Sequence, residues 1–197
     1  MDILLLVLCA IIGYLIGSVN SSVIVGRFFK TDIRKQGSGN AGLTNTLRVL
    51  GKKAAIFVLL GDILKGVIAC LLGLLIVENG MPVAGTFAVV GHNWPVYFGF
   101  KGGKGVLTSA TVVFMLDWRI GLVVLAIFII IVSLTRFVSL GSILSAIAVP
   151  IGAVVADKGV LFIVCTLVLA AMILFRHRGN MVRLWQGREH KLTFRKD

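Results

Sequence analysis

Acidic residues are scarce in this sequence. Only 8 of its 197 residues are Asp or Glu, whereas 20 are Lys or Arg. Because Mg²⁺ and Ca²⁺ bind proteins mainly through carboxylate oxygens, this scarcity gives little support to a metal site built from protein side chains. We therefore expect neither a metal nor a cofactor.

Cysteines and familiar enzyme signatures are also few. The 3 cysteines lie inside apolar runs without CxxC spacing, which favours packing residues over metal ligands. No HExxH, GxSxG or EF-hand pattern occurs. The HxxxxD signature of acyl-CoA-dependent glycerolipid acyltransferases is missing too, because none of His92, His177 and His190 has Asp five positions later. The sequence thus gives no support to these enzyme and calcium-binding classes.

Apolar residues dominate what is present. They make up 58% of the chain, and the mean hydropathy of +1.02 is far above that of a soluble domain of this size. The net charge of +12 comes from basic residues beside apolar runs, which is typical of membrane topology rather than of nucleic-acid binding. We expect an all-α integral membrane protein with a single domain, 1–197, that contacts membrane lipid and no nucleic acid.

The apolar runs predict about seven transmembrane helices. Two of them, 82–92 and 105–116, are short for a hydrocarbon core of about 30 Å, and a five-span topology with 82–116 re-entrant or interfacial stays open. Basic residues gather in alternate connections, so the positive-inside rule puts the N-terminus outside and the C-terminus in the cytoplasm. The tail, 176–197, is expected to lie on the inner membrane surface. The predicted helices are 3–26, 54–77, 82–92, 105–116, 119–134, 139–156 and 160–175.

One predicted helix carries two charges. Asp62 and Lys65 are three residues apart, hence on one face of the helix, where they can form an ion pair. Charges inside a membrane are costly and often functional. Mutual neutralisation is the interpretation that the spacing favours.

The stretch 91–108, GHNWPVYFGFKGGKGVLT, organises the rest of the chain. Its glycines, among them Gly102 and Gly103, leave backbone N–H groups uncovered, and Lys101 and Lys104 add positive charge. The segment after Gly105 is predicted to be a helix whose N-terminus points at the same place. The pattern predicts a phosphate site, although a tight basic turn also fits it.

A second glycine loop lies within 27–53. The run GSGNAG formally fits GxGxxG, but no strand precedes it and no acidic residue follows about twenty positions on, so a dinucleotide site is not supported. Uncovered amides and polar side chains remain, and they predict a second anion site. The candidate ligands are Ser38, Asn40, Thr44, Asn45 and Arg48.

Three blocks together carry a family resemblance: GSGNAGLTN with Arg48, GHNWPVYFGFKGGKGVLT, and HRGNMVRLWQGRE. In motif order, length and hydropathy the chain resembles the bacterial acyl-phosphate:glycerol-3-phosphate acyltransferases, the PlsY family. The resemblance implies transfer of a fatty acyl group from acyl phosphate to the 1-hydroxyl of sn-glycerol 3-phosphate, giving lysophosphatidic acid and phosphate. It also implies a multi-pass protein of the bacterial inner membrane that works as a monomer, with its active site facing the cytoplasm.

The resemblance assigns roles residue by residue. Ser38, Lys104 and His177 would be catalytic, and Glu189 would be structural or pair with an arginine of the tail. The proton of the attacking hydroxyl would pass to the donor phosphate or to His177, and a covalent acyl-Ser38 is less attractive because no His–Asp relay adjoins it. The substrate-binding residues would be Asn40, Thr44, Arg48, Gly102, Gly103, Ser142 and Asn180.

Three positions depart from the family pattern, and two other functions compete with it. Leu43 and Leu107 stand where alanine is usual, and Gly179 stands where glutamate is frequent. A small transporter of anionic metabolites is the first alternative, but the sequence shows no inverted repeat. A structural membrane subunit is the second, and it leaves the polar loops unexplained.

Overall fold

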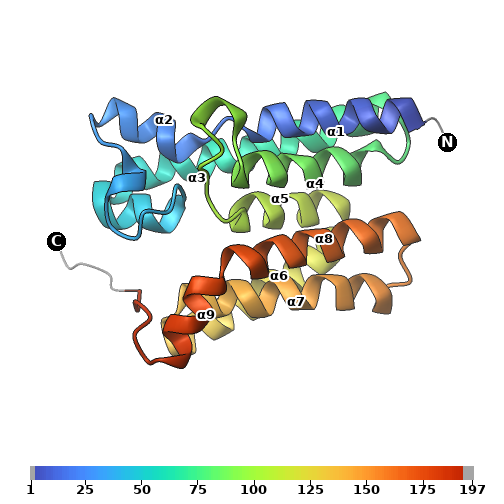
Figure 1. Cartoon of the computed structure of the whole chain (residues 1–197). Coiled ribbons are helices and arrows are strands. Elements are labelled where there is room, and N and C mark those ends of the chain that lie inside the picture. The colour runs from blue at the N-terminus through green and yellow to red at the C-terminus, as the bar shows by residue number, and fades with distance from the viewer. Residues whose placement is uncertain (1–2, 193–197) are drawn as a thin grey trace. The chain divides into compact units, whose positions relative to one another are not determined.

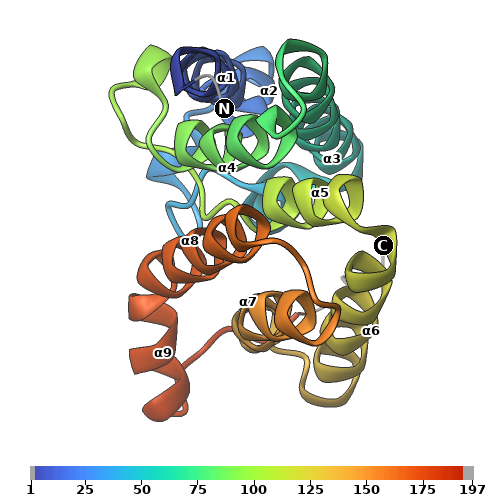
Figure 2. The same cartoon turned by 90° about the vertical axis from the view of Figure 1, so that its right-hand side faces the viewer.

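The computed structural model describes residues 3–192, which form helices, single 3-10 turns and loops, with no strand among them (Figures 1 and 2). By its internal packing the chain divides into two compact units, the first ending at Leu116 and the second beginning at Asp117. This division does not test the predicted single domain, which stays a prediction. The first unit holds α1 (Ile3–Gly17), α2 (Ser21–Phe28), η1 (Ile33–Lys35), α3 (Leu43–Ile76), α4 (Gly80–Asn93), η2 (Val96–Phe98) and α5 (Val106–Leu116).

In the first unit, α1, α3 and α4 pack against one another, and α5 packs against α3 and α4 (Figure 1). The α1–α4 pair approaches closely because Gly13 and Gly17 lie directly against the backbone at Ala84 and Ala88. Small residues spaced four apart allow this contact, as they do in many membrane helix pairs. A side chain at either glycine would force the two helices apart.

Two breaks interrupt the apolar helices of this unit. The first separates α1 from α2 at residues 18–20, where the Asn20 side chain caps α2 by accepting from the Val23 N–H at 3.1 Å. The second is a kink within α3 at Gly51, whose φ of 80° and ψ of −175° are not helical. The first break lies beside the second glycine-rich stretch, because the Ser18 hydroxyl accepts the Val96 N–H at 3.4 Å.

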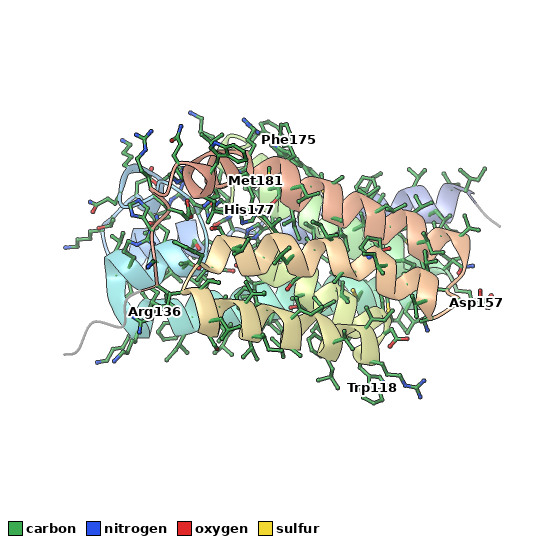
Figure 3. The ribbon with its side chains drawn as sticks, turned by 90° about the horizontal axis from the view of Figure 1, so that it is seen from below. Trp118, Arg136, Asp157, Phe175, His177 and Met181 are labelled. Carbon is green, nitrogen blue, oxygen red and sulfur yellow. The ribbon has the colours of Figure 1, made fainter. Side chains whose placement is uncertain are left out.

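The second unit is built from α6 (Trp118–Thr135), α7 (Val138–Val155), α8 (Val160–Arg176) and α9 (Arg178–Trp185). Helix α7 packs between α6 and α8 (Figure 2). Within this unit Trp118 and Asp157 lie at one end, while Arg136 and His177 lie at the other (Figure 3). Helix α6 therefore begins at one end of this unit, and α9 with its flanking loops lies at the other end.

The end of the second unit near Trp118 is held by one carboxylate. Asp117 accepts the Arg119 and Ile120 N–H groups at 2.8 and 3.3 Å, which caps α6, and its other oxygen lies 2.6 Å from the Lys158 ammonium. Hydrogen bonding from Lys158 holds the pKa of Asp117 below its ordinary value. This pair ties the start of α6 to the loop between α7 and α8.

Helices occupy the seven ranges expected from the sequence, but the first range, 3–26, is broken at residues 18–20 into α1 and α2. The other ends are shifted by one or two residues, except in α3. That helix begins at Leu43 rather than 54, because the polar run before the kink is also helical. Four helical stretches are long and apolar enough to cross a membrane, or five if α8 with α9, bent by 56°, counts as one span. Among the described residues, neither α4 nor α5 belongs to this set, so the number of spans between five and seven stays a prediction.

Candidate active site

The first glycine loop, residues 29–42, packs against a small apolar core. Val23, Ile33 and Ala41 are buried together, with Val49 and Phe98 packed against them. Within the loop, Gly37 and Gly39 take positive φ of 58° and 71°, which a side chain would strain. The loop thus has a defined shape, with Gly37 and Gly39 exposed to solvent.

Asn45 holds this loop from the first turn of α3. Its Oδ1 accepts the Ser38 N–H at 2.8 Å, and its Nδ2 donates to the carbonyls of Ile33 and Gln36 at 3.1 and 3.0 Å. The prediction that Asn45 donates to a bound anion is wrong for this structure, because its donors are directed into the loop. Its buried position explains why: a buried amide must satisfy its hydrogen bonds inside the protein.

The other predicted residues of the first loop and of the start of α3 remain accessible. Ser38 and Arg48 are exposed, and Asn40 and Thr44 are half-buried. α3 begins directly after Gly42, which has no side chain to cap the first turn. The positive end of the α3 dipole therefore lies close in the chain to the hydroxyl groups of Ser38 and Thr44. Such an arrangement is suited to binding an anion.

The second glycine loop, residues 94–105, ends where the sequence predicted. Gly105 has a φ of 73°, and α5 starts at Val106. Gly102 and Gly103 are buried, Lys104 is half-buried and Lys101 is exposed. The Gly103 N–H donates to the His92 carbonyl at 3.1 Å, so in this structure Gly103 shapes the loop rather than offering that N–H to a phosphate.

The two glycine loops of the first unit meet. The position of a side chain at Gly103 is filled by the Ala41 carbonyl and the His92 ring. Farther along, the Arg34 guanidinium donates to the Phe98 carbonyl at 3.0 Å. The structure thus brings the loop that contains Ser38 into contact with the loop that contains Lys104. The sequence alone did not reveal this contact, because the two loops are far apart in the chain.

Arg34 is a basic residue of this region that is committed to another partner. It forms a two-pronged ion pair with Asp32, with distances of 2.9 and 3.0 Å. Hydrogen bonding from Arg34 holds the pKa of Asp32 below its ordinary value, and the pKa of Arg34 is raised in turn. Arg34 therefore holds the loop in place.

A cluster of buried charged and polar side chains lies next to the second glycine loop. The Lys65 ammonium is 2.7 Å from Asp62 Oδ1 and 2.7 Å from His92 Nδ1, and the Ser21 hydroxyl donates to Asp62 Oδ1 at 3.0 Å. The predicted pairing of Asp62 with Lys65 is confirmed. Sequence reasoning missed His92 as the third member, because it comes from another helix.

In the second unit, His177 lies at the bend between α8 and α9 (Figure 3), and Asn180 lies in the first turn of α9. Both are buried, with relative exposures of 3% and 7%. His177 Nδ1 lies 2.8 Å from the Ile173 carbonyl, which can only accept, so Nδ1 carries the proton in this arrangement. The Asn180 amide donates to Glu189 at 2.6 Å, so a specific partner fixes the orientation of each side chain.

Glu189 gathers three donors of this unit. Besides Asn180, the Ser139 hydroxyl donates to Oε1 at 2.9 Å, and Arg183 Nε lies 2.7 Å from Oε2. Burial alone would raise the pKa of Glu189, but these hydrogen bonds outweigh it and hold the pKa below its ordinary value. The expected pairing of Glu189 with an arginine of the tail is confirmed.

The remaining predicted residue, Ser142, is buried in α7. Its hydroxyl donates to the Val138 carbonyl at 2.9 Å, one turn back in the same helix. Binding a phosphate would require that hydroxyl to rotate away from Val138. Among residues 3–192, no group of three or more His, Cys, Asp or Glu side chains is arranged to hold a metal ion.

Comparison with known proteins decides the family. The family model described as glycerol-3-phosphate acyltransferase matches residues 7–187. The chain belongs to this family. A glycerol-3-phosphate acyltransferase of Thermoanaerobacter pseudethanolicus is 48% identical over 189 residues, which cover 94% of this chain and 95% of the relative. One from Clostridioides difficile is 41% identical, with all of both chains covered.

Solved structures of the family agree with the fold. A crystal structure of PlsY (YgiH), an integral membrane glycerol 3-phosphate acyltransferase in its glycerol 3-phosphate form, matches with a TM-score of 0.91 and 37% identity over 95% of this chain and 96% of that one. Its lysophosphatidic acid form matches with a TM-score of 0.88 and 36% identity, over 95% of each chain. The protein described here is accordingly a multi-pass membrane protein and an acyltransferase.

Proposed function

We propose that this protein transfers a fatty acyl group from acyl phosphate to the 1-hydroxyl of sn-glycerol 3-phosphate, giving lysophosphatidic acid and inorganic phosphate. The observation that carries the proposal is the meeting of two glycine-rich loops, each leading into a helix N-terminus, with Lys104 beside them. Both substrates contain phosphate, which such loops bind. The similar PlsY structures with glycerol 3-phosphate and lysophosphatidic acid support the choice of acceptor and product.

In this proposal the first unit handles phosphate groups. Ser38 and Asn40 of the first loop and Thr44 and Arg48 of α3 bind phosphate oxygens, and Lys104 adds a full positive charge from the second loop. Gly102 and Gly103 let the second loop lie close to the first. Charge that develops on the leaving phosphate is stabilised by these preorganised groups.

The second unit supplies the groups assigned to the acceptor, His177 and Asn180, and Ser142 is assigned to the donor phosphate. The Asn180 amide already has its geometry set by Glu189 at 2.6 Å, which supports a positioning function. His177 donates through Nδ1, and in the neutral form of the ring Nε2 is the hydrogen-bond acceptor. An acceptor nitrogen of this kind suits a substrate hydroxyl.

The chemistry proposed is direct attack. The hydroxyl oxygen of glycerol 3-phosphate bonds to the acyl carbon, the bond from that carbon to the phosphate oxygen breaks, and phosphate leaves. The hydroxyl proton passes either to the departing phosphate or to His177. Ser38 binds phosphate here and forms no covalent acyl intermediate, in keeping with its place in a loop whose described contacts include no His–Asp relay.

The membrane arrangement is also part of the proposal. The chain is proposed to work as a monomer and as one domain in the bacterial inner membrane, with its N-terminus outside and its C-terminus and active site on the cytoplasmic side. It crosses the membrane seven times, or five times if α4 and α5 do not span it. No cofactor and no metal is required.

The test is phosphate release by the purified protein from palmitoyl phosphate, with and without glycerol 3-phosphate, and with palmitoyl-CoA as the other donor. Release that requires the acceptor and does not occur with the thioester is the expected result. Phosphate release without the acceptor would indicate a hydrolase. Absence of product with either donor would overturn the proposal, and uptake of phosphorylated metabolites by liposomes would then test the transporter alternative.

A further inference from the structure

We propose that Asp62, Lys65 and His92 form a positioning network that fixes the His92 tautomer and thereby the shape of the second glycine loop. All three side chains belong to the first unit and are buried. His92 stands at the end of α4, directly before the loop, whereas Asp62 and Lys65 come from α3. The consequence for catalysis rests on the proposed function, but the tautomer and the loop contact do not.

The Lys65 ammonium has an acceptor for each of its donors. It lies 2.7 Å from Asp62 Oδ1, 2.7 Å from His92 Nδ1 and 3.3 Å from the Val19 carbonyl. An ammonium group has three N–H donors and no acceptor. Its contact with the ring therefore requires a lone pair on Nδ1.

This requirement decides the protonation of His92. A neutral imidazole with a lone pair on Nδ1 carries its proton on Nε2. A doubly protonated ring would have no acceptor for Lys65 and would place a second cation 2.7 Å from it. Asp62 Oδ1, at 3.7 Å from Nδ1, already accepts from Lys65 and Ser21. The network consequently keeps the ring neutral with Nε2–H.

The Nε2 edge of His92 is the edge that faces the glycine loop. A side chain placed at Gly103 would strike His92 Nε2 and the Ala41 carbonyl. The main chain adds a second contact, because the Gly103 N–H donates to the His92 carbonyl at 3.1 Å. His92 thus contacts Gly103 through both its ring and its backbone, one residue before Lys104.

A purely structural function for the charged pair does not explain the third member. Asp62 and Lys65 neutralise each other without help from α4, and an acceptor for the remaining Lys65 N–H need not be a side chain that also reaches Gly103. The histidine adds a directional contact between a rigid, buried charge pair and the loop that carries Lys104. Displacing such a loop by about 1 Å is enough to cost on the order of 100-fold in rate.

The first experiment measures the tautomer without using activity. The protein is labelled with nitrogen-15 at histidine, and the His92 signals are assigned by comparison with the His92→Gln variant. We expect the Nε2–H tautomer, unchanged through the pH range in which a free imidazole titrates. An Nδ1–H tautomer, or a ring that titrates there, would overturn the proposal.

The second experiment separates positioning from packing. In His92→Asn the amide oxygen can replace Nδ1 as the acceptor for Lys65, but nothing reaches the position of Nε2. We expect kcat/KM for acyl transfer to fall about 10- to 100-fold and the inhibition constant of inorganic phosphate to rise, while the thermal midpoint stays near that of the wild type. The matched control is His190→Asn in the exposed tail, which should match the wild type in every measurement.

The outcomes distinguish this inference from the proposed function. Loss of stability in His92→Asn with unchanged kcat/KM and unchanged phosphate inhibition would reduce His92 to a packing residue and overturn the inference. If the wild-type protein showed no acyl transfer, the proposed function would fail. The tautomer and the binding of inorganic phosphate, measured by titration of the labelled protein, would still decide whether the network shapes the loop.

Discussion

Asp62 in the first unit and Glu189 in the second each gather several polar partners, and the two arrangements are built differently. Asp62 lies within an apolar helix, and its cationic partner Lys65 is supplied by the next turn of the same helix. Glu189 lies in a loop, and its donors come from the start of α7 and from α9. The first arrangement neutralises a charge that the apolar segment could not otherwise accommodate. In the second arrangement, the Glu189 carboxylate connects its own loop to α7 and α9 through hydrogen bonds.

The largest effect is expected from removing one member of the buried Asp62–Lys65 pair. Lys65→Met leaves Asp62 buried without its cation, so we expect the free energy of unfolding to fall by about 3–5 kcal/mol. Reversible unfolding in mixed detergent measures it. The double variant Asp62→Leu with Lys65→Met should recover most of that stability, because no unpaired charge is left. A double variant as unstable as Lys65→Met would contradict the ion-pair explanation.

The loop beside the buried pair is tested by Lys104→Ala. Removing a cation that stabilises transition-state charge is expected to lower kcat/KM by about 100- to 1,000-fold with little effect on stability. Steady-state phosphate release measures the change. The matched control is Lys101→Ala, an exposed lysine three residues away in the same loop, which should retain most activity. Near-normal turnover by Lys104→Ala would remove Lys104 from the site.

For the second unit, His177→Ala tests the acceptor side. Loss of one substrate hydrogen bond is expected to raise KM for glycerol 3-phosphate about tenfold. The dependence of kcat on pH then identifies the base: it disappears in the variant if His177 takes the proton, and persists if the donor phosphate does. An unchanged KM together with an unchanged pH profile would exclude His177 from both functions.

Glu189→Gln tests the loop carboxylate of the second unit. Replacing charged hydrogen bonds with neutral ones should lower the free energy of unfolding by about 1–2 kcal/mol near pH 7. Because the pKa of Glu189 is held below its ordinary value of 4.5, its contribution is present above that value and is lost as the pH falls through the lower folded pKa. Unfolding measured across this acidic range should therefore show the wild type and the variant converging.

The smallest effect is expected at the opposite end of the second unit. Lys158→Gln breaks a partly exposed ion pair with Asp117 and should cost no more than about 1 kcal/mol. Asp117 would keep its helix-capping hydrogen bonds in this variant. High salt should reduce the difference between wild type and variant. A loss as large as that of Lys65→Met would show that the difference between buried and surface pairs has been overstated.

Much of this fold follows from local sequence. The seven helical ranges come from long apolar runs, although the break at 18–20 within the first was not predicted, and the start of α5 follows from Gly105 and the apolar residues after it. The helical part of α3 before the kink was missed because its polar residues and the glycine at 51 resemble a loop. There the surrounding apolar core, with Ile33, Val49 and Leu50, overrides local composition.

The sequence by itself determined the membrane character, most of the helical ranges, the Asp62–Lys65 pair and the positions of the two glycine loops. Each depends on residues that are close in the chain: apolar length, a three-residue spacing on one helix, or glycines beside lysines. Only the tertiary structure decided that Ala41 meets Gly103, that His92 joins Lys65, that Asn45 is used to hold its own loop, and that Ser139 shares Glu189 with Asn180. These contacts join residues on different elements or fix which way a side chain turns, and hydrogen-bond geometry in the folded interior decides both.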